Sequence, residues 1–243
     1  MDECLFMKIL VVGDSSAGKT SFLRRLCYDI FEQDTNQTVG CDYCMKTIEN
    51  MAKKVIKLQL WEIAGIFQFY FMINPSGQGN CAVASKLYIR GAIGVFIIAD
   101  LTNPQGLESA LRWRQIIMEG DDTFESKDIP IIIIQNKLDR IISDKKDFQS
   151  ETYLHEFVSK NHFSAGFQVS AKTGENINET IEVLVREVLK MEQEGRRNRT
   201  SRFTLSEDSL LRLSKHSLEA SRRKSMLFRA NDTESKENSN CAC

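Results

Sequence analysis

The 243-residue chain is 42% hydrophobic and 27% charged with three prolines, a composition typical of a folded soluble protein of one domain plus an appendage. Its formal net charge of −1 argues against nucleic-acid binding by the whole chain, and its longest apolar runs, "GVFIIA" and "IPIIII", are too short to span a bilayer. The seven cysteines have no metal-like Cys/His spacing and no signal peptide precedes the first strand pattern, so we expect a reducing, cytosolic compartment.

Strand and helix patterns alternate along the first 195 residues. Alternating apolar and polar residues predict a hairpin in the first third of the chain, and continuous apolar runs further on predict buried central strands. The predicted strands cover residues 7–14, 41–49, 53–61, 91–100, 128–137 and 166–171. The predicted helices cover residues 19–28, 105–119, 148–161 and 176–193. This order predicts an α/β fold: a doubly wound, mostly parallel six-stranded sheet with one antiparallel edge strand and flanking helices, binding its ligand outside the carboxyl ends of the strands.

Residues 196–243 differ from the rest of the chain in composition. They are rich in Ser, Arg, Asn and Lys, and residues 196–230 hold ten Lys/Arg against three acidic residues. We predict a domain over residues 1–195 followed by a basic, disordered tail. A basic amphipathic helix over residues 206–228 is the alternative.

The segment "GDSSAGKT" (residues 13–20) matches the P-loop pattern G-x-x-x-x-G-K-[ST] between a predicted strand and a predicted helix. Glycines let the backbone curl until several N–H groups point inward, and the helix N-terminus adds a potential that favours phosphate. Lys19 can reach the β- and γ-phosphates, and the Thr20 hydroxyl can ligate Mg²⁺. The predicted nucleotide contacts here are Asp14, Ser15, Ser16, Ala17, Gly18, Lys19, Thr20 and Ser21.

A second motif, "NKLD" (residues 136–139), follows a predicted central strand and indicates which base is bound. A carboxylate at Asp139 can accept hydrogen bonds from the ring N–H and the exocyclic amine of guanine, a donor pair that adenine lacks. Taken alone, the motif is also compatible with an ordinary solvated turn. The predicted base contacts are Asn136, Lys137 and Asp139, together with Ser170, Ala171 and Lys172 of the loop "SAK" after the last strand.

With these motifs in this order, residues 6–192 resemble the Ras superfamily of small GTPases, and within it the Rab type. The segments "TVGCDYCMKTI", "KLQLWEIAG" and "YIRGAIGVFIIADLTN" carry the Rab resemblance. It implies GTP or GDP and Mg²⁺ as ligands, with Phe31 on the guanine edge and Gly65 among the nucleotide contacts. It also implies that Thr38, in the segment called switch I, closes over Mg²⁺ and the γ-phosphate.

The metal site departs from the family pattern at one position. The resemblance implies Thr20 and Thr38 as Mg²⁺ ligands and an aspartate that orients a metal-bound water, but Glu62 stands where that aspartate is expected. Glutamate keeps the charge and is one methylene longer. Because Mg²⁺ demands near-ideal octahedral geometry, we expect weaker metal support rather than its loss.

The second departure lies in switch II, where the family pattern A-G-Q supplies the glutamine that orients the attacking water. Read without a gap, Ile66 takes this place. Counting back from "RGA" (residues 90–92) instead matches Gln78, and removing residues 66–77 leaves "WEIAGQGN". We therefore predict a 12-residue insertion with Gln78 as the displaced catalytic glutamine, alongside Lys19 and Thr38.

The insertion has two readings. Its apolar side chains indicate a docking loop or lid, whereas its clean removal favours a splice or gene-model variant. Under either reading, extra residues between Gly65 and Gln78 displace the glutamine, and we predict slow intrinsic hydrolysis. The Rab resemblance implies an activating protein that supplies an arginine and its own glutamine.

The chain ends in "CAC", and the resemblance implies geranylgeranyl groups on Cys241 and Cys243. It also implies an effector surface at Tyr43, Trp61 and Tyr88, and as partners an exchange factor, a GTPase-activating protein, effectors, the prenylation machinery and a GDP-dissociation inhibitor. The expected location is the cytoplasmic face of an intracellular membrane, in exchange with the cytosol. The function implied is a GTP-hydrolysing switch in vesicle trafficking; the alternative is a non-hydrolysing GTP-binding scaffold whose insertion binds a partner.

Overall fold

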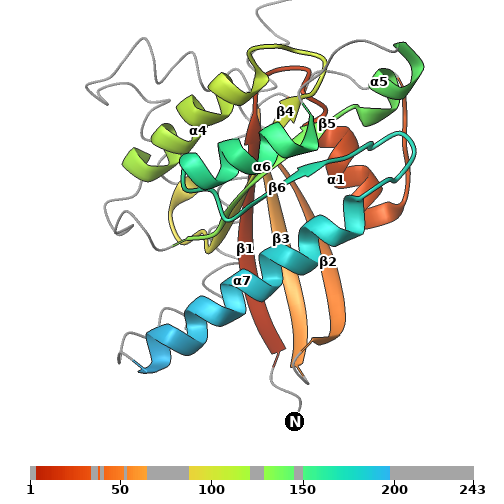
Figure 1. Ribbon diagram of the computed structural model, residues 1–243. Coiled ribbons are helices and arrows are strands. Elements are labelled where there is room, and N and C mark those ends of the chain that lie inside the picture. Colours follow the sequence, from red (N-terminus) through yellow and green to blue (C-terminus); the bar gives the residue numbers. More distant parts are fainter. Residues whose placement is uncertain are drawn as a thin grey trace, which may run out of the picture.

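A twisted sheet forms the centre of the protein, with helices on both of its faces (Figure 1). The computed structural model describes residues 4–33, 38, 41–51, 54–64, 88–120, 129–144 and 150–197. The sheet has the strand order β2-β3-β1-β4-β5-β6. Its strands are β1 (Cys4–Gly13), β2 (Cys41–Met51), β3 (Lys54–Ile63), β4 (Gly94–Asp100), β5 (Ile131–Asn136) and β6 (Ala165–Gln168).

Strand directions confirm the predicted fold class. Strand β2 runs antiparallel to β3 at one edge, and the other neighbouring pairs are parallel. All residues of β5 are buried, as are all of β4 except Asp100, which is what a continuous apolar run predicts for a central strand covered on both faces.

The helices divide between the two faces of the sheet. They are α1 (Lys19–Tyr28), α4 (Gly106–Gly120), α5 (Leu138–Asp144), α6 (Glu151–Lys160) and α7 (Ile177–Arg197). One core cluster joins α1 and α7 to the sheet through residues such as Phe22, Phe96 and Leu184. The other joins α4 and α6 to the opposite face through residues such as Trp113, Ile133 and Leu154.

Most elements differ from their predicted bounds by one to three residues at one or both ends, and strand β6 ends at Gln168 rather than at residue 171. Helix α5 was not predicted, because its seven residues begin inside the "NKLD" motif and offer too short a stretch for a helical period. Strand β4 begins at Gly94 rather than at residue 91. Helix α7 continues to Arg197, four residues beyond its predicted end at 193 and two beyond the predicted end of the domain. No proline follows Gly195 to stop it.

Some predictions lie outside the described residues: the insertion at 66–77, Gly65, Gln78, the disordered tail beyond residue 197, and lipidation of Cys241 and Cys243. Among the helices that are described, none combines the length and the apolar character needed to cross a membrane.

Candidate nucleotide site

The P-loop joins β1 to α1 at the carboxyl edge of the sheet, and two glycines determine its path. Gly13 has φ 143°, and a Cβ there would lie 2.1 Å from the Ile98 carbonyl oxygen of β4. Gly18 has φ 89°, and a Cβ there would lie 2.4 Å from Asn136 Nδ2. Both contacts are far inside van der Waals range, so a larger residue at either position would displace the loop.

Lys19 begins α1 and is buried, with 5% of its surface exposed. Its ammonium donates to the carbonyl oxygens of Gly13 (2.9 Å) and Asp14 (2.7 Å) and therefore lies across the loop. Burial lowers the pKa of Lys19, while the nearby carboxylates of Glu62 and Asp14 act in the opposite direction. A desolvated cation enclosed by a curled backbone is suited to bind the oxygens of a polyphosphate.

Asp14, predicted as a nucleotide contact, is hydrogen-bonded through its side chain to helix α4. Its Oδ1 accepts hydrogen bonds from Ser109 Oγ (2.5 Å) and Trp113 Nε1 (2.9 Å) of α4. The backbone carbonyl of Asp14 accepts from Lys19 Nζ. The side chain thus anchors the P-loop to α4, a support that the motif pattern did not reveal because Ser109 and Trp113 lie about a hundred residues away in the sequence.

Three predicted metal-site residues converge from three different segments. The Thr20 and Thr38 hydroxyl oxygens are 2.9 Å apart, and both hydroxyls donate to Glu62 Oε1, at 2.7 Å from Thr20 and 3.1 Å from Thr38. Glu62 is 1% exposed, and its Oε2 has no hydrogen-bond partner among the described residues. This set consists of oxygen atoms, the donors that Mg²⁺ prefers, and the buried Oε2 leaves one acceptor available to a metal-bound water.

The charge on Glu62 is held in a buried environment. Burial raises the pKa of its carboxyl group, whereas the hydrogen bond from Thr20, the charge of Lys19 and the hydrogen bond from Thr38 lower it, and the net shift is upward. A buried carboxylate that lacks full compensation is an environment in which a divalent cation would be stabilising.

The predicted base loops are tied to the P-loop by Asn136. Its Nδ2 donates to the Ala17 carbonyl oxygen at 3.2 Å, and its Oδ1 accepts from the Ala171 N–H at 3.0 Å. Asn136 is 2% exposed. One buried amide therefore connects the three predicted loops, P-loop, "NKLD" and "SAK", at the same edge of the sheet.

Lys137 and Asp139 are held by partners that the sequence motif does not show. Lys137 has φ 75°, and its ammonium donates to the Ser16 carbonyl oxygen (2.8 Å) and to Asp100 Oδ2 (2.7 Å). Asp139 Oδ1 accepts from Ser170 Oγ at 2.6 Å. Because Ser170 is fully buried, this bond fixes the orientation of the carboxylate that we predict to read guanine.

Arg25 of α1 is a further support that sequence reasoning missed. Its Nε donates to the Ala171 carbonyl oxygen and its Nη2 to the Lys172 carbonyl oxygen, each at 2.9 Å. Its Nη1 forms an ion pair with Asp29 Oδ1 at 2.8 Å. The planar guanidinium thus holds the backbone of the "SAK" loop against the end of α1.

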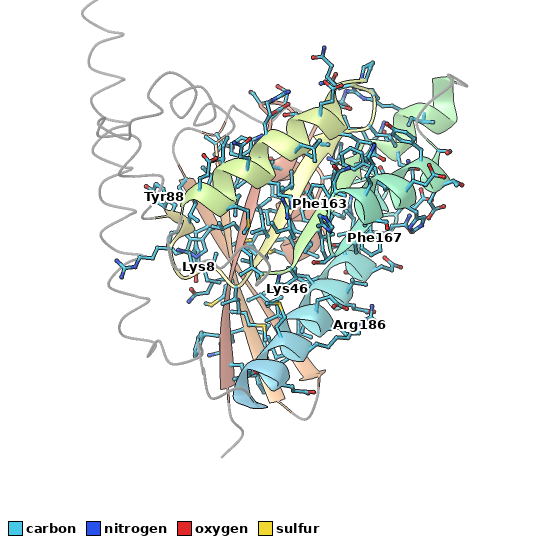
Figure 2. All side chains as sticks on the ribbon, turned by 60° about the vertical axis from the view of Figure 1, so that its left-hand side comes forward. Lys8, Lys46, Tyr88, Phe163, Phe167 and Arg186 are labelled. Carbon is cyan, nitrogen blue, oxygen red and sulfur yellow. The ribbon has the colours of Figure 1, made fainter. Side chains whose placement is uncertain are left out.

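The predicted effector residues all belong to or pack against one core cluster, the one that includes residues of α4 and α6. The Tyr43 and Trp61 rings meet edge to face with centroids 5.0 Å apart, and Tyr88 packs on the same core cluster. Lys8 Nζ lies 5.2 Å from the Trp61 ring centroid and donates to the Arg90 carbonyl oxygen (Lys8 and Tyr88 are labelled in Figure 2). Phe31 is half-buried, and no described contact tests its predicted place on the guanine edge.

The fold and the converging loops define a P-loop protein of the GTPase class. The model of the Ras family matches residues 8–190. The Ras-related protein Rab-32B of Dictyostelium discoideum is 31% identical over 76% of this chain, which spans just under two thirds (65%) of that relative's length. The Ras-related protein Rab-32 of Homo sapiens is 30% identical over 77% of this chain and 76% of its own length, and Rab-32C of Dictyostelium discoideum is 33% identical over 86% and 84%.

The chain belongs to the Ras family, as a small GTPase of the Rab type. The resemblance predicted from "GDSSAGKT", "NKLD" and "SAK" is therefore confirmed.

Proposed function

We propose that the protein is a GTP-regulated membrane switch in vesicle trafficking, with intrinsically slow GTP hydrolysis. The observation that carries the proposal is the convergence of Thr20, Thr38 and Glu62 Oε1 within 3.1 Å of one another. Thr38 lies in switch I, so a cation bound to both hydroxyls would couple the position of switch I to the bound nucleotide.

The proposed site is specific for guanine nucleotides. Asn136 holds the three loops together, and Ser170 fixes the Asp139 carboxylate. Adenine would leave the Asp139 carboxylate facing an acceptor instead of two donors, a mismatch that costs much more than the loss of one contact. Phe31 is the proposed side chain on the guanine edge, and Lys172 the exposed member of the "SAK" loop.

Mg²⁺ is the proposed cofactor, with Thr20 and Thr38 as direct ligands and Glu62 acting through a water molecule. When bound, the ion would neutralise charge on the phosphate oxygens. Lys19 contributes a second positive charge from inside the P-loop, and the backbone of residues 14–18 with Ser21 and Gly65 completes the proposed set of contacts.

Slow hydrolysis follows from the proposed insertion at residues 66–77. It places twelve residues between Gly65 and Gln78, and a small misplacement of a water-orienting group lowers the rate strongly. Deleting residues 66–77 should accelerate single-turnover phosphate release by on the order of a hundredfold. The matched control is Gln78→Leu in the deleted chain, which should abolish the gain.

The measurement begins with the nucleotide that co-purifies with the chain, identified by chromatography for both the full chain and the deletion. Guanine nucleotide in both, with faster hydrolysis only in the deletion, supports the proposal. An unchanged rate after deletion would show that the insertion does not limit catalysis, and co-purifying ATP or no nucleotide would contradict the guanine site itself.

A second candidate function is a GTP-binding scaffold that does not hydrolyse and binds a partner through the insertion. The apolar composition of that segment, "IFQFYFMI", favours it. The two candidates separate in the presence of a GTPase-activating protein: a switch shows stimulated turnover, whereas a scaffold retains GTP.

As a Rab-type switch, the protein is proposed to work with an exchange factor, a GTPase-activating protein and effectors that dock on Tyr43, Trp61 and Tyr88. Prenylation of Cys241 and Cys243 is proposed to anchor it to the cytoplasmic face of an intracellular membrane, and a GDP-dissociation inhibitor to return it to the cytosol. Two lipid chains give stable anchoring where a single chain does not.

A further inference from the structure

Two cysteine sulfurs lie in contact outside the nucleotide site. Cys27, in the last turn of α1, and Cys44, on β2, place their Sγ atoms 2.8 Å apart. Because a disulfide bond is about 2.05 Å long, the two sulfurs need to approach by only about 0.8 Å to form one. Cys44 is 8% exposed and belongs to the core between α1 and the sheet, whereas Cys27 is more open to solvent.

The groups around this thiol pair make the two sulfurs chemically different. The hydrogen bond from Cys44 and the charge of Lys46 lower the pKa of Cys27, against the opposing effect of burial. The same hydrogen bond and burial raise the pKa of Cys44, with smaller contributions from the acidic groups of Asp42 and Glu62. Lys46 is held in place by its hydrogen bond to the Leu26 carbonyl oxygen (Lys46 is labelled in Figure 2).

We propose that Cys27 and Cys44 form an oxidisable thiol pair that links α1 to β2 when a peroxide is present. Cys27 is the more accessible sulfur and attacks the peroxide, which gives a Cys27 sulfenic acid and one water (or alcohol) molecule. The Cys44 thiol then attacks that sulfur, forms the disulfide and releases a second water. In total, the two thiols lose two electrons and two protons, and the peroxide is reduced.

The disulfide would join the two ends of a segment that contains proposed nucleotide and metal contacts. Between Cys27 and Cys44 lie residues 28–43, which include Phe31 and Thr38. Oxidation would therefore tie both ends of switch I to each other, and we expect it to restrict the displacement of Thr38. This consequence for the nucleotide rests on the proposed function, whereas formation of the disulfide does not. Reversible disulfides of this kind in a reducing compartment typically serve redox sensing.

The test is peroxide treatment of the full chain followed by mapping of its disulfides. Trypsin cannot separate the relevant cysteines, because no Lys or Arg lies between residues 26 and 45. Cleavage before aspartate can, because Asp29, Asp34 and Asp42 place Cys27, Cys41 and Cys44 in three different peptides. We expect a Cys27–Cys44 linked peptide that disappears when the sample is reduced.

Cys41 provides the matched control within the same strand. Cys41 lies three residues from Cys44 and packs on the opposite core cluster, and burial raises its pKa to about 12. We therefore expect the Cys41 thiol to be oxidised at least about tenfold more slowly than the Cys27 thiol. A link between Cys27 and Cys41, or oxidation of Cys27 to sulfinic acid with Cys44 still free, would overturn the proposal.

Single substitutions test the order of the two steps. In Cys44→Ser the sulfenic acid on Cys27 should persist and react with dimedone, because no second thiol resolves it. In Cys27→Ser, Cys44 should stay reduced. The mapping on the natural chain decides the proposal even if either variant folds poorly.

The effect on switch I is measured separately, as release of a fluorescent GDP analogue before oxidation, after oxidation and after reduction. We expect release to slow several-fold on oxidation and to recover on reduction, with Cys41→Ser behaving like the natural chain. A mapped Cys27–Cys44 disulfide with unchanged release would overturn the coupling to switch I, and failure to bind any guanine nucleotide would instead contradict the proposed function.

Discussion

At the scale of single residues, the length of the Glu62 side chain determines what the two threonine hydroxyls contact. Glu62 Oε1 reaches both hydroxyls directly. An aspartate is one methylene shorter and would leave them free to face a cation and its water. We expect Glu62→Asp to lower the Mg²⁺ concentration needed to retain GDP by on the order of tenfold, because groups behind the metal ligands typically change metal affinity by this amount.

The measurement is the release rate of a fluorescent GDP analogue across a Mg²⁺ titration. Glu62→Gln is the control of equal length without charge, and it should need more Mg²⁺ than the natural chain. If Glu62→Asp retains GDP no better at low Mg²⁺, the prediction that the length of the glutamate weakens Mg²⁺ binding is wrong.

Asp100 stabilises the protein through its hydrogen bonds with Lys137 and Thr102. Burial acts to raise the pKa of its carboxyl group, but hydrogen bonds from Lys137 and Thr102 outweigh burial, and the net shift is downward. Its stabilising contribution is therefore fully present above the unfolded-state pKa of about 3.9 and is lost as the pH falls through the lower folded-state pKa. Asp100→Asn should reduce the free energy of unfolding at pH 7 by about 1–2 kcal/mol, since the partly buried ion pair with Lys137 loses its negative partner.

Urea unfolding at several pH values checks this prediction. The difference between Asp100→Asn and the natural chain should be constant from pH 7 to about 5 and shrink below about pH 4, where the natural carboxylate becomes protonated. Glu187→Gln, which breaks the solvent-exposed pair with Lys190, is the control and should change stability by less than about 0.5 kcal/mol. A difference that does not vary with pH would show that the Asp100 charge is not the stabilising feature.

At the scale of secondary-structure elements, α1 supports two nucleotide-binding loops at once. Its first residue, Lys19, lies in the P-loop, and Arg25 holds the Ala171 and Lys172 carbonyl oxygens of the "SAK" loop. Arg25→Ala should accelerate GDP release by on the order of tenfold, because loss of two charge-assisted hydrogen bonds frees the loop behind the base. Arg25→Lys should rescue only in part, since an ammonium cannot reproduce the planar fork.

Arg24→Ala is the matched control on the neighbouring residue. Arg24 pairs with Glu32 at the surface, where both side chains are substantially exposed, so its loss should leave release nearly unchanged. The readout that separates positioning from general stability is the release rate measured well below the melting temperature of each variant. Equal rates for the two alanine variants would contradict a positioning role for Arg25.

Sequence patterns predicted some secondary-structure elements and could not predict some side-chain roles. Helix α1 was predicted with its bounds, because a P-loop motif and a helical period agree there. The central strands β4 and β5 followed from apolar runs, since burial on both faces leaves no polar alternation. The roles of Arg25 and Asp14 could not be predicted, because their partners are distant in sequence and those of Arg25 are backbone carbonyls that carry no residue signature.

At the scale of the whole molecule, the parallel strands bring all the loops of the site to one edge of the sheet (Figure 1). This geometry leaves two of the predicted effector residues, Tyr43 and Trp61, on the antiparallel pair β2 and β3, which is joined to the site through Thr38 and Glu62. A change in the position of Thr38 therefore has a short path to Tyr43 and Trp61. The proposed membrane attachment, by contrast, depends on the basic segment 196–243, whose first two residues are the last two of α7.

The basic tail should add electrostatic attraction to the proposed lipid anchor. Residues 196–230 carry ten basic and three acidic side chains, a balance of seven positive charges. Each Lys or Arg near an anionic surface contributes about 1 kcal/mol, so replacing Arg222, Arg223 and Lys224 by glutamine should weaken binding by roughly a hundredfold at low ionic strength. The change should shrink as salt screens the charges.

The assay is co-sedimentation of prenylated protein with vesicles that contain phosphatidylserine. Neutral vesicles are the control, and the natural chain and the glutamine variant should bind to them equally. Replacing Cys241 and Cys243 by serine should remove binding to neutral vesicles, leave only weak, salt-sensitive binding to anionic vesicles, and not change GDP release. Strong binding of that double variant to neutral vesicles would contradict the proposed lipid anchor and direct the search to another membrane-binding segment.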